Sequence, residues 1–253
     1  MIDQPLMQSI PDRKFRFACH KDLPCFTKCC ANLNLVLTPY DVIRLKNRLN
    51  LSSEAFLETF TTSDIDQSYG VPVVRLKMKD DESRNCPFVS RKGCAVYEDR
   101  PGACRLYPLG RAALKISEKY SAGEYYFVVK ESHCLGFNEE QEWTVQEWIV
   151  DQGVDEDNET NELFMNITAG RQAKVIKALS DPQLQMFYLA CYNLDEFRRF
   201  VFETTFLDKF DIAPDVLTHI QTDDMKLMAF AFKWLRFSLF GEKTLQIRQH
   251  LRV

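Results

Sequence analysis

Glycine and proline are scarce in this sequence, which has 9 Gly and 10 Pro among 253 residues and no low-complexity tract or internal repeat. This composition is typical of a folded globular chain rather than a disordered or fibrous one. Glycine-rich phosphate loops, the nucleophile elbow of acyl hydrolases and the paired histidines of zinc proteases are absent. The C-x3-C-x2-C spacing of radical adenosylmethionine clusters is also absent. Nucleotide, acyl-transfer and zinc-protease chemistries therefore have no motif here.

The chain also has no excess of positive charge. It contains 32 Lys and Arg and 36 Asp and Glu, which give a net charge of −4. Nucleic-acid-binding proteins usually carry a basic patch, so we expect no nucleic-acid partner. No stretch approaches 18 uncharged apolar residues, and the first residues lack a basic start, an apolar run and a cleavage site. We therefore expect a cytoplasmic protein without a membrane anchor.

Cysteine is the residue that stands out. Eight of the nine cysteines lie in the first 134 residues, at Cys19, Cys25, Cys29, Cys30, Cys86, Cys94, Cys104 and Cys134. Disulfides persist in oxidising compartments, whereas the reducing cytosol leaves thiols available as metal ligands. In a chain expected to be cytoplasmic, the eight thiols therefore indicate metal ligands. Cys191 stands alone in an apolar stretch, where we expect a small buried side chain and no metal.

The number of clustered thiols allows several kinds of centre. Eight thiolates make two tetrathiolate sets, enough for two zinc sites, two cubane iron–sulfur clusters, or one cluster with further redox or structural thiols. The adjacent pair Cys29 and Cys30 favours some of these, because one zinc ion needs sulfurs roughly 3.8 Å apart and neighbouring side chains diverge. Both thiols can bind a polynuclear cluster, or two different metals, more easily than one zinc ion.

The residues around the cysteines resemble a known family. The segment FRFACHKDLPCFTKCC, the later CPFV and GCAVYEDRPGACRLYPLG, and HCLGF are similar to the YkgJ-type cysteine-cluster family of zinc- or iron-chelating proteins. The resemblance covers about residues 15 to 138 and implies a metal site more firmly than a reaction. One departure is visible, since family members commonly have C-x2-C-x2-C-C where this chain has gaps of five and three residues.

The fold class predicted from the pattern is α+β. We expect a cysteine-rich metal-binding part with short helices and a small sheet at residues 1–140, followed by a mainly helical module at 141–253. The module either packs on the first part or forms one continuous domain with it. Helix starts and stops predict helices at 39–49, 53–60, 145–152, 181–192, 194–207, from 214, and from 224 to 240. Residues 71–78 and 125–129 are predicted as strands that pair in one small sheet around the second cysteine group.

Charged residues beside the cysteines are further candidates. Arg100 and Arg105 flank Cys104 and are candidates for binding the cofactor. A guanidinium there could neutralise the charge of a thiolate cluster, recognise a substrate carboxylate, or simply hold the loop through an ion pair. His20 and His133 each adjoin a cysteine. With eight thiols present, we expect these histidines to lie beside the ligands or on the surface rather than to bind the metal.

Three functional hypotheses follow. The first is a redox protein, a candidate iron–sulfur oxidoreductase, whose cysteines hold one or two clusters, of the 4Fe-4S type, and which has a protein redox partner. The second is a zinc- or iron-binding module for structure or metal handling, without catalysis. The third and weaker one is a part in a protein-modification system, because related cysteine clusters occur beside protein-methylating modules.

Overall fold

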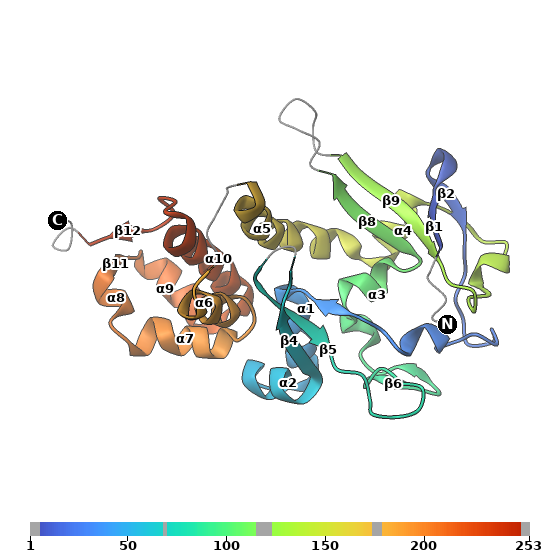
Figure 1. The fold of residues 1–253 in the computed structure, drawn as a ribbon, viewed down its shortest axis with the longest axis horizontal. Coiled ribbons are helices and arrows are strands. Elements are labelled where there is room, and N and C mark those ends of the chain that lie inside the picture. The colour runs from blue at the N-terminus through green and yellow to red at the C-terminus, as the bar shows by residue number, and fades with distance from the viewer. Residues whose placement is uncertain (1–5, 68–69, 115–122, 174–178, 249–253) are drawn as a thin grey trace. The chain divides into compact units, whose positions relative to one another are not determined.

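The computed structural model describes residues 6–67, 70–114, 123–173 and 179–248. The chain forms two compact units, each built from two segments. The cysteine unit consists of Met1–Leu33 and Met78–Asn158, and the helical unit of Asn34–Lys77 and Glu159–Val253. The expected α+β class with a mainly helical carboxyl-terminal part is confirmed (Figure 1).

Each unit contains two separate segments of the chain, whereas a single boundary at residue 140 would give each unit one continuous segment. Residues 34–77 lie with the carboxyl-terminal helices, and residues 141–158 lie with the cysteines. A compact unit in a fold and a unit that unfolds cooperatively are different things. Where the chain divides on unfolding therefore stays a prediction, for which amide exchange is the measurement.

The cysteine unit is made of short strands and helices. In chain order these are β1 (Leu6–Ser9), η1 (Pro11–Arg13), β2 (Lys14–Arg16), η2 (Lys28–Cys30), β6 (Val89–Ser90), β7 (Gly93–Cys94), η3 (Tyr97–Asp99), α3 (Gly102–Leu106), β8 (Leu109–Leu114), β9 (Gly123–Lys130), η4 (Gly136–Asn138), β10 (Glu142–Thr144) and α4 (Val145–Gln152). The strands pair antiparallel in the orders β1-β9-β8, β10-β2 and β6-β7. Helix α5 (Val154–Ala173) begins here and continues into the helical unit.

An aromatic cluster forms the core of the cysteine unit. Trp148 lies at its centre, with its ring centroid 5.9 Å from that of Phe15 and 5.6 Å from that of Phe17. The Trp148 Nε1–H donates to the carbonyl of Leu106 over 3.0 Å, which satisfies its one buried polar group. Phe17 belongs to this core and also lines the cysteine cavity described below. The site therefore has a packed wall on that side.

The helical unit combines a small sheet with a bundle of helices. Its elements are β3 (Val36–Leu37), α1 (Pro39–Leu49), α2 (Ser53–Phe60), β4 (Thr61–Ile65), β5 (Pro72–Leu76), α6 (Asp181–Cys191), α7 (Leu194–Glu203), α8 (Phe206–Lys209), β11 (Phe210–Asp211), α9 (Pro214–Thr222), α10 (Asp224–Phe240) and β12 (Gln246–Ile247). Strands β3 and β4 flank β5, and β11 pairs with β12. Phenylalanines and Trp234 fill the space between α7, α8 and α10.

Several helix boundaries predicted from capping residues are confirmed. Thr38 and Asp41 form a reciprocal capping box before α1, and Thr144 and Glu147 form another before α4. Gly153 ends α4 in the left-handed conformation, with a φ of 62° that glycine adopts without strain. These signals are read correctly because donor and acceptor lie within one turn of the chain.

Two predictions were wrong in detail. The expected helix at 194–207 stops at Glu203 because the Thr204 hydroxyl donates to the carbonyl of Phe200 and accepts from the N–H of Phe206, competing with the helical pattern. The two predicted strands exist as β5 and β9, but they do not pair with each other. Strand β5 lies between β3 and β4 in the helical unit, whereas β9 lies between β1 and β8 in the cysteine unit.

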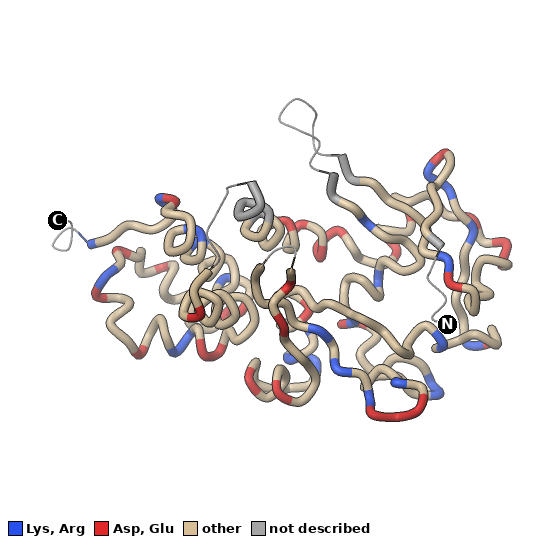
Figure 2. Tube along the Cα trace, viewed as in Figure 1, with Lys and Arg blue, Asp and Glu red and all other residues tan. Residues whose placement is uncertain are grey.

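Charge is mixed along the described chain, with Lys and Arg interspersed among Asp and Glu in both units (Figure 2). Among the described helices, none combines the length and the apolar character that crossing a bilayer requires.

Candidate metal centre

The first cysteine group lies on a tightly coiled loop. Consecutive turns are closed by N–H bonds from Leu23 to His20 O, from Phe26 to Leu23 O, from Lys28 to Cys25 O and from Cys30 to Thr27 O, at 2.9–3.2 Å. Thr27 adopts a left-handed conformation with φ 67°, and the short helix η2 carries Cys29 and Cys30. Such coiling brings cysteines that are four to six residues apart onto one concave side.

Four cysteines line one small cavity. Cys134 reaches it from the turn after β9, and the other three come from the coiled loop. The residues that line the cavity are Phe17, Cys19, Leu23, Cys25, Cys29, Tyr107, His133, Cys134 and Gly136. The structure thus brings together four of the eight candidate ligands, from segments more than 100 residues apart in the chain.

Gly136 allows the two segments to approach. Its carbonyl accepts a bond of 3.1 Å from the N–H of Ala18. A Cβ at this position would lie 2.5 Å from the Ala18 carbonyl oxygen and 2.7 Å from the Phe17 ring. Only glycine fits so close to a neighbouring backbone, and this contact places Cys134 beside the coiled loop.

Donors point at the sulfurs of the cavity. The N–H of Leu135 donates to Cys25 Sγ over 3.3 Å. The Tyr107 hydroxyl, which donates to Glu131 Oε2 over 3.2 Å, is also in hydrogen-bond contact with Cys134. Hydrogen bonds to sulfur stabilise thiolate ligands and tune bound clusters.

Electrostatics in the cavity disfavour several thiolates side by side. Burial raises the pKa of Cys19 to about 11, and the neighbouring thiols of Cys29, Cys134 and Cys25 add to this. The pKa of Cys29 is raised first by a hydrogen bond with Cys30 and then by burial. Burial likewise raises the pKa of Cys134, although Tyr107 and the N–H of Gly136 oppose it. A bound cation reverses this balance, because it deprotonates the thiols that coordinate it.

A second set of thiols gathers around the hairpin of β6 and β7. Cys94 ends the hairpin and pairs with Val89 across it. Burial raises the pKa of Cys86, the N–H of Phe88 opposes this, and the neighbouring thiol of Cys94 raises it further. Cys86 also donates its N–H to the carbonyl of Cys30 over 2.8 Å. Three more of the candidate ligands therefore lie on neighbouring backbone segments.

The remaining candidates occupy other places. Cys104 is partly buried on α3, and Cys191 is fully buried in α6, where burial raises its pKa well above the usual value. His133 lines the cavity, whereas His20 is exposed and lies 3.4 Å from Glu139. In the described parts of the chain, no three His, Cys, Asp or Glu side chains lie in an arrangement that could already hold a metal ion.

The two arginines hold the loop that precedes α3. Arg100 donates to the carbonyl of Tyr97 and to Gln152 Oε1, at 2.6 and 2.7 Å. Arg105 donates to the carbonyls of Glu98, Arg100 and Gln152, and its Nε lies 3.7 Å from Asp157 Oδ2. These contacts fit the alternative in which the arginines hold the loop, and neither residue lines the described cavity. Their contact with a cofactor stays a prediction.

Tyr107 is a polar cavity residue that the sequence did not predict. It follows the Cys104-Arg105 motif by two positions and lies next to Pro108. A tyrosine hydroxyl facing sulfur needs contacts from Glu131 and Cys134, which lie on a distant segment. The local sequence held no signal for those contacts beyond the proximity of Tyr107 to the cysteine motif.

The comparison with family models agrees with the cysteine pattern. Residues 18–135 match the CxxCxxCC family, described as "Putative zinc- or iron-chelating domain". The resemblance to the YkgJ-type cysteine-cluster family is thereby confirmed for this segment, and the match supports metal binding by residues 18–135. No curated protein and no solved structure matches the chain.

Proposed function

We propose that this chain is an iron–sulfur protein that transfers electrons, with its cluster held by thiols of the cysteine unit. The observation that supports this most is the cavity lined by Cys19, Cys25, Cys29 and Cys134, a set of four soft donors. Thiolates of this number suit iron–sulfur clusters and zinc alike. The choice between them depends on the surroundings of the sulfurs.

One feature favours a cluster. Backbone N–H groups reach sulfur at Cys25 and Cys86, and such bonds tune the potential of bound iron–sulfur clusters. Binding would need the cysteine side chains to turn toward one centre, because the described thiols are not already arranged as ligands. A cysteine side chain reaches sulfur through one rotatable bond, so this turn is a small change.

Electron transfer is favoured by the exposure of one ligand. Cys19 is exposed, whereas Cys25 is buried in the same cavity. When bound, an iron–sulfur cluster exchanges single electrons at a potential set by hydrogen bonds and solvent access. The surface around Cys19 would then be the place where a protein redox partner approaches.

Purification without oxygen tests the proposal. We expect brown protein that contains iron and acid-labile sulfide, and an absorbance that bleaches on reduction. Stoichiometric zinc without sulfide in the oxygen-free sample would instead support the zinc-binding module. The same preparation of Cys191→Ala is the matched control, because this thiol is fully buried in the helical unit and should leave the metal content unchanged.

A further inference from the structure

The adjacent cysteines Cys29 and Cys30 face different neighbours. Cys29 lines the cavity, with Cys19, Cys25 and Cys134. Cys30 does not belong to the lining, and its carbonyl accepts the N–H of Cys86 over 2.8 Å. The two thiols are in hydrogen-bond contact with each other, but only Cys29 lines the cavity, and the backbone of Cys30 is bonded to that of Cys86. The pair therefore stands where the two groups of cysteines meet.

The strand register puts Cys30 opposite Cys86. Ala31 and Asn85 form an antiparallel bridge, and the bond from Asn32 N–H to the Arg84 carbonyl, 2.9 Å long, lies on one side of it. The bond from Cys86 to Cys30 lies on the other side. Residues directly opposite in such a pair point to one face with Cβ atoms about 5 Å apart.

The hairpin of β6 and β7 adds the third thiol. Val89 donates its N–H to the carbonyl of Cys86 over 3.2 Å and is paired with Cys94 in the next strand. The thiols of Cys86 and Cys94 interact electrostatically, and the N–H groups of Phe88 and Val89 point at the Cys86 sulfur. A turn that aims two backbone N–H groups at a cysteine sulfur is suited to hold that sulfur as a thiolate ligand.

We propose that the chain binds two separate thiolate metal centres, one at the cavity of Cys19, Cys25, Cys29 and Cys134 and one at the hairpin, with Cys30, Cys86 and Cys94. The inference rests on the proposed function and deepens it, because it assigns the thiols to individual centres. The adjacent pair is divided, with Cys29 in the cavity centre and Cys30 in the hairpin centre. The assignment does not depend on Cys104.

The adjacent pair supplies a matched experiment. Cys29→Ser and Cys30→Ser are prepared in the full-length chain without oxygen, beside the wild type and Cys191→Ala. Iron, zinc and sulfide are counted per chain, and Mössbauer and X-ray absorption spectra resolve the components. We expect each serine variant to lose one component and keep the other. Cys134→Ser, prepared in the same way, should lose the same component as Cys29→Ser, and Cys86→Ser the same component as Cys30→Ser.

The outcomes separate the two proposals. A wild type with a single component, or Cys29→Ser and Cys30→Ser that deplete the same component, would show one shared centre and overturn the division while leaving the iron–sulfur protein intact. A metal-free wild type would overturn both proposals. Misfolding would give a different result. Two isosteric substitutions at adjacent positions that unfolded the chain would remove both metal components together, not a different component in each variant.

Discussion

The cysteine unit and the helical unit differ in what holds their segments together. In the helical unit, buried aromatic rings pack directly, as with Phe197, whose ring centroid lies 5.3 Å from that of Trp234. The cysteine unit has an aromatic core around Trp148, but its loops at 19–30 and 86–94 carry thiols where a core would carry hydrocarbon. A hydrophobic core is formed by the chain alone, whereas thiolate loops depend on a metal to be closed.

The largest expected difference follows on metal removal. Chelation under reducing conditions should give fast amide exchange in the cysteine unit and leave the helical unit protected. The reason is that binding energies of roughly 10–16 kcal/mol for structural zinc sites become folding energy when the apo site does not persist. Hydrogen exchange resolved by peptide is the measurement. Equal loss of protection in both units would show one cooperative fold.

Helix α1 sharpens the same experiment. It lies within residues 1–140 of the sequence but belongs to the helical unit. If its amides stay protected together with those of α10 after metal removal, the chain divides as the compact units do. If they are lost together with those of the cysteine loops, the chain divides near residue 140.

The second prediction tests whether the helical unit is held together by its aromatic core. Phe197→Ala should destabilise the helical unit by about 3–5 kcal/mol, as large-to-small changes of buried aromatic residues do. Phe197 is 0 % exposed and contacts the rings of Phe200, Phe230 and Trp234. Metal content should stay unchanged, since the residue belongs to the other unit.

Urea unfolding followed by far-ultraviolet circular dichroism measures this loss, with each unit treated as its own transition. The control is Val150→Ala on α4, whose side chain is 62 % exposed and should cost no more than about 0.5 kcal/mol. A loss of metal in Phe197→Ala would show that the two units do not behave independently.

These contrasts also explain which features could be predicted from the sequence. Both capping boxes and the Gly153 stop are local, so a window of a few residues contains the complete signal. The pairing of β1 with β9 joins residues such as Met7 and Val129, and no short window contains both partners. The placement of β5 in the helical unit escaped prediction for the same reason.

The candidate site was predictable in composition but not in arrangement. Eight thiols and their family pattern identified the metal-chelating segment, which the family match confirms. Which thiols share a cavity depends on Gly136, whose approach to Ala18 brings Cys134 to the coiled loop. Gly136 and Ala18 are far apart in the sequence, so no short window contains both partners of this contact.

A smaller effect is therefore expected from Gly136→Ala. The added methyl group would collide with the backbone of Ala18, and such overpacking costs about 1–3 kcal/mol. Metal content should fall as well, because Cys134 would be displaced from the other cavity thiols. Metal per chain and the midpoint of thermal unfolding are the measurements.

The matched variant is Gly241→Ala in the helical unit. Gly241 has a φ of 67° and open space where a Cβ would lie, so alanine adds backbone strain of about 1–2 kcal/mol without a collision. Its metal content should equal that of the wild type. Equal metal loss in both glycine variants would contradict the role assigned to Gly136.

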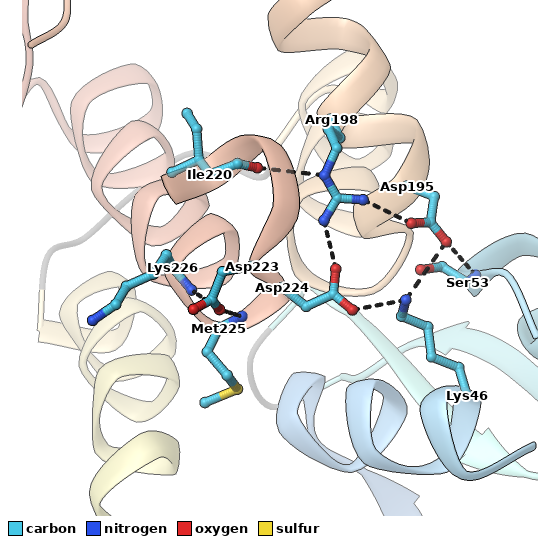
Figure 3. A network of polar contacts seen from close by, with 9 residues as sticks. All are labelled: Lys46, Ser53, Asp195, Arg198, Ile220, Asp223, Asp224, Met225 and Lys226. Atoms are coloured by element: carbon cyan, nitrogen blue, oxygen red, sulfur yellow. Dashed lines mark hydrogen bonds and ion pairs between the residues drawn. The ribbon is translucent and has the colours of Figure 1, made fainter. Parts of the chain in front are cut away.

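The smallest expected effect concerns a polar network that lies inside the helical unit (Figure 3). Lys46 Nζ lies 2.8 Å from Asp224 and 3.7 Å from Asp195, and Arg198 binds both carboxylates. Burial acts to raise the pKa of Asp195 and of Asp224. At Asp195 the N–H of Ser53 and the charges of Lys46 and Arg198 outweigh burial, and at Asp224 Lys46 and Arg198 do so. Both pKa values are therefore lowered in the folded state.

The sign of the pH dependence follows from these shifts. A carboxylate whose pKa is lower in the folded state stabilises the fold above its unfolded pKa, near 3.9, and this contribution is lost as the pH falls through the folded pKa. Lys46→Met should raise both folded pKa values, so its acid unfolding should begin at a higher pH. At pH 7 we expect a loss of about 1–2 kcal/mol, between the values for exposed and for fully buried ion pairs.

Urea unfolding of wild type and Lys46→Met at pH 7 and at pH 3 measures this difference. It should shrink at the lower pH, because the stabilisation that comes from the lowered carboxylate pKa values is lost as the pH falls. The control is Lys14→Met, which removes the exposed pair of Lys14 with Glu142, 3.3 Å apart, in the cysteine unit. That change should lower the free energy of unfolding by no more than about 0.5 kcal/mol and leave the acid unfolding of the helical unit unchanged. If the cost of Lys46→Met stayed the same at both pH values, the lysine would contribute through the packing of its hydrocarbon stem rather than through its charge.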